Sequence, residues 1–431
     1  GSIEKKVNER QKYNAYQYDF SSTFNLGKFF PNDFGLKVPM YVGRSQAVKN
    51  PQYNPLDPDI LLTKSLAALD SKAEKDDLKE IKNRFELIIK WGPYEGYSNL
   101  LLPQALNASK LEDRDRSLVT ELLYGTIRMQ GKHDYAISKK ADRPIEELDE
   151  KIVDLLRIGI HQIFEMRVSA HAAVGETVEV ARAVAGESKA TYINAVLRSI
   201  SADLDIYNDL ESNVNISDLE KLSILYSHPI WIITAYYDQL KDWDAVRDLL
   251  RKNNIPVAPH IVSWPGKSTV SEILETGGEK LAIGTYSVLS NHLPNEYPAI
   301  KDKRAGIQDM GSQLVSEIFF ATKNDAPQKW LDLCAGPGGK AALLHNLLQV
   351  EKPNDGFLAN EPTQHRAELV ARVVPKNKIV SFDGRDVASF NETYDRILID
   401  APCTGLGALR RRPEARWRRS INDLKELLPL Q

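Results

Sequence analysis

Cysteine is scarce in this sequence of 431 residues, which contains two, Cys334 and Cys403. Two cysteines cannot form a disulfide framework or a cysteine-rich zinc site. The eight histidines show no metal-ligand spacing, so we expect no bound metal. Both cysteines lie in glycine- or proline-rich stretches, which indicates a reducing cytoplasmic compartment and a place for thiol chemistry.

Long apolar runs and an excess of positive charge are also missing. No run of about 18 apolar residues occurs, and a membrane-spanning helix needs such a run, so we expect no membrane partner. The formal net charge is −3 at pH 7, which does not indicate a general binder of polyanions. Any nucleic-acid surface therefore has to be local.

The first part of the chain, residues 1–81, differs from the rest. It is rich in Tyr, Phe, Asn and Pro and carries turn signals in "NPQYNPLDPDILL" (50–62). This stretch resembles a segment of the SprA-type outer-membrane secretion protein of gliding Bacteroidetes. We expect residues 1–81 to be a fused or unrelated segment that is poorly ordered alone, because its few short strands lack a visible partner sheet.

Two further regions precede the C-terminal part. Residues 82–205 place aliphatic side chains at helical spacing, as in "DRSLVTELLYGTIR" (115–128) and "IVDLLRIGIHQIF" (152–164), which predicts an all-α bundle. Residues 206–300 mix helix and strand signals and predict a small α+β subdomain.

Residues 301–431 alternate between strand and helix patterns. Expected strands occupy "KWLDLCAG" (329–336), "GFLANE" (356–361), "KIVSFD" (378–383) and "DRILIDAP" (395–402). This rhythm predicts a doubly wound parallel sheet, which binds ligands at the carboxyl ends of its strands.

A glycine-rich turn follows the first of these strands. A phosphate-binding P-loop would need Gly at 334 and Ser or Thr at 341, but the residues are Cys334 and Ala341. The dinucleotide pattern does fit Gly336, Gly338 and Ala341, so an NAD-dependent oxidoreductase stays open as an alternative.

Carboxylates end the next three strands and favour a different cofactor. Glu361 suits a ribose diol, Asp383 an adenine amine, and Asp400 a position beside the transferring group. Acids in place of a basic phosphate cradle suit a cationic nucleoside, and the sulfonium of S-adenosylmethionine is such a group.

The stretch "DAPCTGLGALRRRPEARWRR" (400–419) adds a thiol and a basic segment. Cys403 follows a strand end, where a nucleophilic thiolate could reach a pyrimidine. A run of charge is usually a solvated face, but arginine mixed with an aromatic favours an RNA-binding surface. The predicted RNA contacts are Arg410, Arg411, Arg412, Arg416, Trp417 and Arg418.

These motifs resemble the RsmB/Nop/Sun family of RNA cytosine-5 methyltransferases, in particular its bacterial 16S ribosomal RNA members. The signatures are "DLCAGPGGK" (332–340), "FLANE" (357–361), "DGRD" (383–386) and the 400–417 stretch. Upstream helical stretches resemble a NusB-like RNA-binding domain, so the resemblance covers about residues 82–431.

The resemblance implies a fold and a set of site residues. The fold is a NusB-like bundle, a small α+β subdomain and a Rossmann-like class I methyltransferase domain with strands one to four of its sheet. A cytoplasmic monomer acting on 16S rRNA is expected. The implied contacts to S-adenosylmethionine or the base are Cys334, Ala335, Gly336, Pro337, Gly338, Gly339, Lys340, Glu361, Asp383 and Asp400.

The resemblance also implies a reaction. In the family a thiolate adds to C6 of cytosine, C5 takes the methyl group, and a second cysteine assists release. Cys403 matches the second cysteine, while the strand-five nucleophile is expected to be missing because the sequence stops at Gln431. We therefore expect Cys403 and Asp400 at the catalytic site but an inactive chain, or alternatively a module that binds RNA and cofactor without catalysis.

Overall fold

The structure is a computed structural model that describes residues 102, 105–106, 111, 113–166 and 168–431. All of these residues belong to one compact unit of the chain. The expected poorly ordered segment, residues 1–81, lies outside the described residues.

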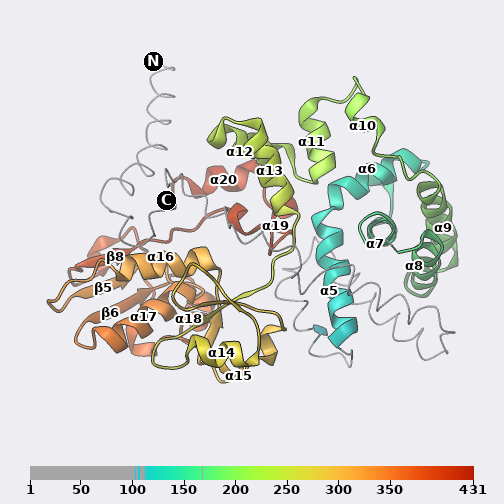
Figure 1. Ribbon diagram of the computed structural model, residues 1–431. Helices are drawn as coiled ribbons and strands as arrows, with labels where there is room; N and C mark the ends of the chain where they lie inside the picture. The colour runs from blue at the N-terminus through green and yellow to red at the C-terminus, as the bar shows by residue number, and fades with distance from the viewer. Residues whose placement is uncertain (1–101, 103–104, 107–110, 112, 167) are drawn as a thin grey trace, which may run out of the picture. The chain divides into compact units, whose positions relative to one another are not determined.

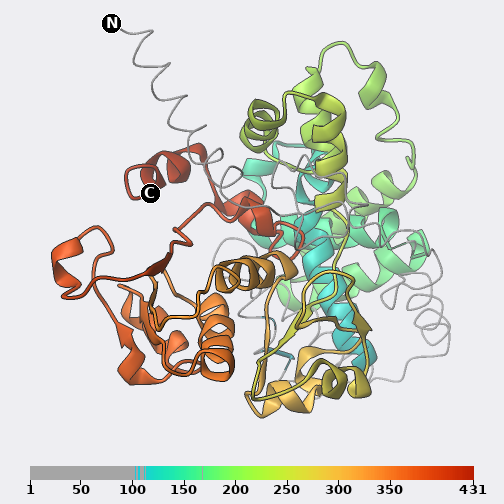
Figure 2. The ribbon, with the colours of Figure 1, turned by 60° about the vertical axis from the view of Figure 1, so that its left-hand side comes forward.

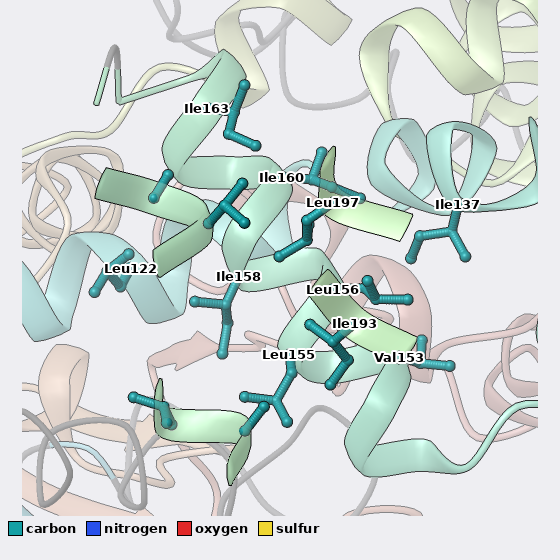
Figure 3. Close-up of a cluster of buried hydrophobic side chains, with 14 of the residues drawn as sticks. Leu122, Ile137, Val153, Leu155, Leu156, Ile158, Ile160, Ile163, Ile193 and Leu197 are labelled. Atoms are coloured by element: carbon teal, nitrogen blue, oxygen red, sulfur yellow. The ribbon is translucent and has the colours of Figure 1, made fainter. Parts of the chain in front are cut away.

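A helical bundle forms the first described part and confirms the predicted all-α region. Its centre is α7, whose Leu155, Leu156 and Ile160 are completely buried (Figure 3). Gly159 lets α7 approach a neighbouring helix, because a Cβ there would lie 2.7 Å from Leu197 Cδ1. The helices are α5 (Asp113–Arg128), α6 (Gln130–Lys140), α7 (Glu150–Phe164), α8 (Ala170–Ala185) and α9 (Glu187–Ser201), with the 3-10 turn η3 (Ile145–Glu147).

Four helices follow the bundle. A break between two helices lies at Ser227, which adopts a left-handed conformation with φ of 55° and ends a helix. The next helix starts directly after Pro229, whose fixed φ suits a helix start. These helices are α10 (Asp209–Ser212), α11 (Asp218–Tyr226), α12 (Ile230–Leu240) and α13 (Trp243–Asn253).

An antiparallel sheet of order β2-β3-β1-β4 comes next. It buries Ile261, Val288 and Tyr297 against two short helices. Its strands are β1 (His260–Ser263), β2 (Glu279–Lys280), β3 (Ser287–Leu289) and β4 (Ala305–Ile307), and its helices are η4 (Pro294–Glu296), α14 (Val270–Thr276) and α15 (Pro298–Lys301). Strand β4 pairs with β1, so this sheet includes residues beyond the expected division at residue 300.

The last part is a parallel sheet of order β7-β6-β5-β8, which confirms the predicted doubly wound fold. Helices α16, α17 and α18 lie against it (Figure 1), and Trp330 and Leu344 are buried in its core. The strands are β5 (Lys329–Asp332), β6 (Gly356–Asn360), β7 (Ile379–Val380) and β8 (Arg396–Leu398), and the helices are α16 (Met310–Phe320), α17 (Gly339–Glu351) and α18 (Gln364–Val370).

The strand order places the topological switch between β5 and β8, where doubly wound sheets bind their ligands. Beyond β8 the chain leaves the sheet as an irregular segment (Figure 2). That segment holds η7 (Leu406–Ala408), α19 (Ala415–Arg418) and α20 (Ile421–Leu427), while η5 (Lys376–Lys378) and η6 (Val387–Ser389) flank β7.

Within the described ranges, no helix is long and apolar enough to cross a membrane. The same residues contain no cluster of three or more His, Cys, Asp or Glu that could hold a metal ion.

Candidate active site

The glycine turn between β5 and α17 is shaped around one buried carboxylate. Gly336 N donates to Glu361 Oε2 at 3.1 Å, and a Cβ added at Gly336 would lie 2.0 Å from the same oxygen. Gly338 caps α17 with φ of 113°, a conformation that favours glycine. Both glycines are therefore required by the local geometry of the turn.

Glu361 lies at the end of β6 with a relative exposure of 2%. Its other oxygen accepts from Thr363 N at 3.0 Å, and Arg366 Nη2 lies 3.5 Å from Oε2. Arg366 also donates to the Gly336 carbonyl, which closes a small network around the turn. A carboxylate has about four acceptor positions, so Glu361 keeps capacity for a hydroxyl donor.

Asn360 holds three strand ends together, a role that the sequence did not indicate. Its Nδ2 donates to Leu333 O at 3.0 Å and to Phe382 O at 3.1 Å, and its Oδ1 accepts from Phe382 N at 2.8 Å. The side chain is completely buried. Asn360 thereby fixes the loops after β5 and β7 on either side of β6.

A charged pair joins the two strands at the switch point. Lys340 Nζ, in the first turn of α17, lies 2.6 Å from Asp400 Oδ2 beyond β8 and 3.4 Å from Ser312 Oγ. The pair places Asp400 and the turn at one edge of the sheet, as expected from the sequence.

Asp332, the last residue of β5, is the site residue that sequence reasoning missed. It has a relative exposure of 1%, and among the described residues no side chain donates a hydrogen bond to its carboxylate, which has only the backbone of Cys334 close by as a donor. Burial and the neighbouring Asp400 charge raise its pKa to about 7. An acid near the end of a predicted strand could have identified Asp332 as a candidate site residue, but a sequence cannot show that an acid is buried.

Asp383 has different surroundings from Glu361. It is exposed, and it accepts hydrogen bonds from Arg385 N at 3.0 Å, Nε at 2.9 Å and Nη2 at 2.6 Å. The Arg385 hydrogen bonds lower the pKa of Asp383 to about 2. Strand β7 ends at Val380, so Asp383 stands on a loop rather than on the paired strand that the sequence predicted.

The two thiols have contrasting environments. Cys334 is half-buried in the turn, and burial together with Asp332 and other nearby acids raises its pKa. Cys403 is exposed on the loop after β8. A thiolate is therefore disfavoured at Cys334, while Cys403 remains accessible to a substrate.

The arginine segment divides into two groups. Arg416 is completely buried and Trp417 is half-buried. Arg410 donates from Nε to Ile255 O at 3.1 Å, and Arg411 pairs with Asp309. Arg412 and Arg418 are the exposed members of the predicted RNA-binding set.

Gln308 borders the turn from the segment before α16. A Cβ added at Gly339 would lie 3.7 Å from its carboxamide carbon, and neither amide atom has a hydrogen-bond partner although the side chain is buried. The next residue, Asp309, lies beside a histidine of β1, and its Oδ1 is 3.5 Å from His260 Nδ1.

Three family models match parts of this chain. The NusB family model matches residues 86–202, the model for the 16S rRNA methyltransferase RsmB/F matches residues 318–431, and a model for a motility-related secretion protein matches residues 1–66. The last match agrees with the resemblance noted for the N-terminal segment.

Similar proteins cover most of the chain. "Putative methyltransferase Rv1407" of Mycobacterium tuberculosis is 38% identical over 361 residues, covering 80% of this chain and 77% of that protein. "Ribosomal RNA small subunit methyltransferase B" of Escherichia coli is 29% identical, with coverage of 78% and 77%.

The crystal structure of PH0851 aligns with a TM-score of 0.64 at 20% identity, covering 81% of this chain and 80% of that one, so it supports the fold. The buried acid Glu361 is bonded to the glycine turn, and the exposed thiol of Cys403 follows the neighbouring strand β8. The relatives and the family model show that the chain belongs to the RsmB/F family of RNA methyltransferases.

Proposed function

We propose that this chain binds S-adenosylmethionine at the carboxyl ends of β5, β6 and β7 and carries the site of an enzyme that methylates C5 of a cytosine in 16S rRNA. The expectation that the chain by itself is inactive stays a prediction, and formation of 5-methylcytosine by it would contradict that prediction. The observation that carries the proposal is the position of the turn, the Lys340–Asp400 pair and Cys403 at the β5–β8 switch point. Among the described residues, the glycine turn follows β5 and an exposed thiol follows its neighbour β8, which supports the proposal.

The residues present fit this cofactor. Glu361 offers acceptor capacity to a ribose diol, and Asp383 offers acceptors to an adenine amine. Asp332 is a buried carboxyl group at the end of β5, and its ionised form would attract a cationic group bound close by. The backbone of residues 334–340 completes the set. When bound, S-adenosylmethionine supplies an electrophilic methyl group.

Cys403 is the exposed thiol among the described residues and lies on the loop after β8. Addition of a thiolate to C6 would form an S–C6 bond and move the C5–C6 π electrons to C5, which becomes nucleophilic. After C5 has gained a methyl group and lost its proton to a base, the S–C6 bond breaks and the thiolate leaves. By the family resemblance Cys403 acts in the release step, and a cysteine substitution distinguishes the two roles.

The proposal includes an RNA partner, a cellular compartment and a role for each domain. The exposed Arg412 and Arg418 supply a local basic surface for the RNA backbone on a chain of net charge −3. We also infer a cytoplasmic monomer, with residues 82–205 as an RNA-binding domain, 206–300 as a recognition subdomain and 301–431 as the catalytic domain.

Calorimetric titration with S-adenosylhomocysteine tests the cofactor assignment. Asp383→Ala should weaken binding about tenfold because it removes an acceptor, whereas Asp386→Ala, which changes an acid bonded to Ser389 nearby, should not. Equal or tighter binding of NAD would reject the assignment in favour of an oxidoreductase.

Incubation with RNA containing 5-fluorocytidine tests the reaction, because fluorine at C5 blocks the final elimination and traps a thiol adduct. If Cys403 attacks the base, Cys403→Ala should abolish the trapped complex. Unchanged trapping in Cys403→Ala would show that Cys403 is not the attacking thiol. A chain that binds RNA and cofactor but forms neither adduct nor 5-methylcytosine is a binding module.

A further inference from the structure

Arg416 lies where the C-terminal ends of three helices meet. Its Nη1 donates to the carbonyl of Arg128, the last residue of α5, at 3.0 Å, and to that of Ser227, which ends α11, at 2.9 Å. The same guanidinium reaches the end of α13 through Asn254 Oδ1 at 2.8 Å and Asn253 O at 3.3 Å. One side chain of the C-terminal segment thus binds three helix ends.

Helix ends explain how a completely buried guanidinium is tolerated. Among the described residues, no carboxylate forms an ion pair with Arg416, and Arg128 is a neighbouring positive charge. The last four carbonyls of a helix lack intrahelical partners, and each helix end carries a partial negative charge of about half a unit. Burial lowers the pKa of Arg416 to about 9, which still leaves it protonated at neutral pH.

Trp417 adds a second attachment at α5. Its Nε1 donates to Ile127 O at 2.7 Å, another carbonyl of the last turn of α5, and its ring packs against the core of the bundle. A Cβ at Gly131 would lie 2.8 Å from Trp417 Cη2, so α6 has space for the indole only because that residue is glycine. Arg416 and Trp417 together form what we call the helix-end clamp.

The clamp holds the far end of the segment that starts at Cys403. Strand β8 pairs over three residues, up to Leu398, and the chain beyond it has no strand partner before α19. Other contacts along this segment reach α12 and α5: Tyr236 Oη donates to Leu406 O at 3.5 Å, and Arg128 Nη2 donates to Arg410 O at 3.4 Å. The Cys403 loop is therefore held on one side by β8 and the Lys340–Asp400 pair, and on the other by the helices together with the Arg411–Asp309 pair.

We propose that the helix-end clamp positions the Cys403 loop at the active site, so that helices α5, α11 and α13 act in catalysis through Arg416 and Trp417. This inference rests on the proposed function of Cys403. Arg416 and Trp417 are positioning residues, and they do not touch the 334–340 turn or Glu361. Removal of the clamp should affect the thiol loop while cofactor affinity stays unchanged.

Hydrogen exchange of the full chain provides a direct test. Arg416→Met keeps most of the side-chain volume and removes the donors, so exchange in residues 399–412 should be at least tenfold faster than in the unchanged protein. Arg419→Met is the matched control, because Arg419 pairs with Asp423 in its own segment at 2.9 Å. Trp417→Phe removes a single donor and serves if Arg416→Met fails to fold.

Adduct formation with 5-fluorocytidine RNA separates positioning from simple stabilisation. In Arg416→Met or Trp417→Phe the rate of adduct formation should fall at least tenfold, while S-adenosylhomocysteine affinity stays within twofold. Faster exchange with unchanged adduct formation would reduce the clamp to a stabilising contact and overturn the proposal, as would unchanged exchange. If the unaltered protein forms no adduct, the proposed function of Cys403 is rejected, and the role of the clamp in catalysis is rejected with it. The role of the clamp in holding the loop is then tested by hydrogen exchange alone, and unchanged exchange in Arg416→Met would reject that role.

Discussion

Lys340 and Asp400 form an ion pair of 2.6 Å that connects the first turn of α17 to the loop beyond β8. The pair spans the switch point of the sheet. Lys340 is mostly buried, with a side-chain exposure of 16%, whereas Asp400 is 52% exposed. The ion pair therefore holds the Lys340 charge among three acids, Asp332, Asp400 and Glu361. Because Asp400 is exposed, the pair adds little to the stability of the fold.

Lys340→Met should reduce formation of the 5-fluorocytidine adduct at least tenfold. The change leaves Asp400 without its cation beside the buried Asp332, and it removes the ion pair that ties the loop beyond β8 to α17. The rate of adduct formation with 5-fluorocytidine RNA measures the effect. Lys329→Met is the control, because Lys329 pairs with Glu392 at 2.8 Å at the opposite, amino-terminal end of β5, and it should keep the original rate.

Asp332 should make stability fall as pH rises. Its folded pKa of about 7 lies above the ordinary value of 3.8, so between these values the folded state holds a proton that the unfolded state has lost. Linkage then lowers the free energy of unfolding as pH increases from about 4 to 7. The loss is full above the folded pKa.

Asp332→Asn should remove that dependence and make the protein more stable than the original above pH 7, by roughly 1–4 kcal/mol. Urea unfolding at several pH values measures it, and Asp325→Asn, an exposed acid before β5, should keep the original profile. A parallel profile for Asp332→Asn would mean that Asp332 does not hold this proton.

Gly336→Ala should abolish detectable binding of S-adenosylhomocysteine, or weaken it at least tenfold. The new Cβ would lie 2.0 Å from Glu361 Oε2, so either the turn or the buried carboxylate has to move. Calorimetry measures the affinity. Gly407→Ala is the matched control, since no atom lies within 4 Å of a Cβ placed there, and an affinity loss in both variants would point to a general folding defect.

Arg412 and Arg418 should bind phosphate groups of the RNA backbone. The double variant Arg412/Arg418→Ala should reduce the slope of log affinity against log salt by roughly 0.7 for each phosphate that is no longer neutralised. Filter-binding titrations with RNA at several salt concentrations measure the slope. Lys425→Ala, an exposed cation on α20, is the control, and an unaltered slope in the double variant would identify the two arginines as a solvated face.

The sequence by itself determined the local features of this protein. The helical spacing around α7, the strand–turn–helix at residues 329–351 and the alternation of strands were predicted and are present. These patterns depend on a residue's near neighbours along the chain. The strand-end acids Glu361 and Asp400 and the thiol of Cys403 were identified in the same way.

Tertiary structure alone decided which charges are buried and what they contact. Sequence patterns treated Arg416 as one arginine of a basic run, yet it binds three helix ends contributed by residues more than 160 positions away. Asp332 and Asp383 are both acids near strand ends, but burial raises the pKa of one and an arginine lowers that of the other. Burial and pairing depend on contacts between distant parts of the chain, and no spacing pattern records them.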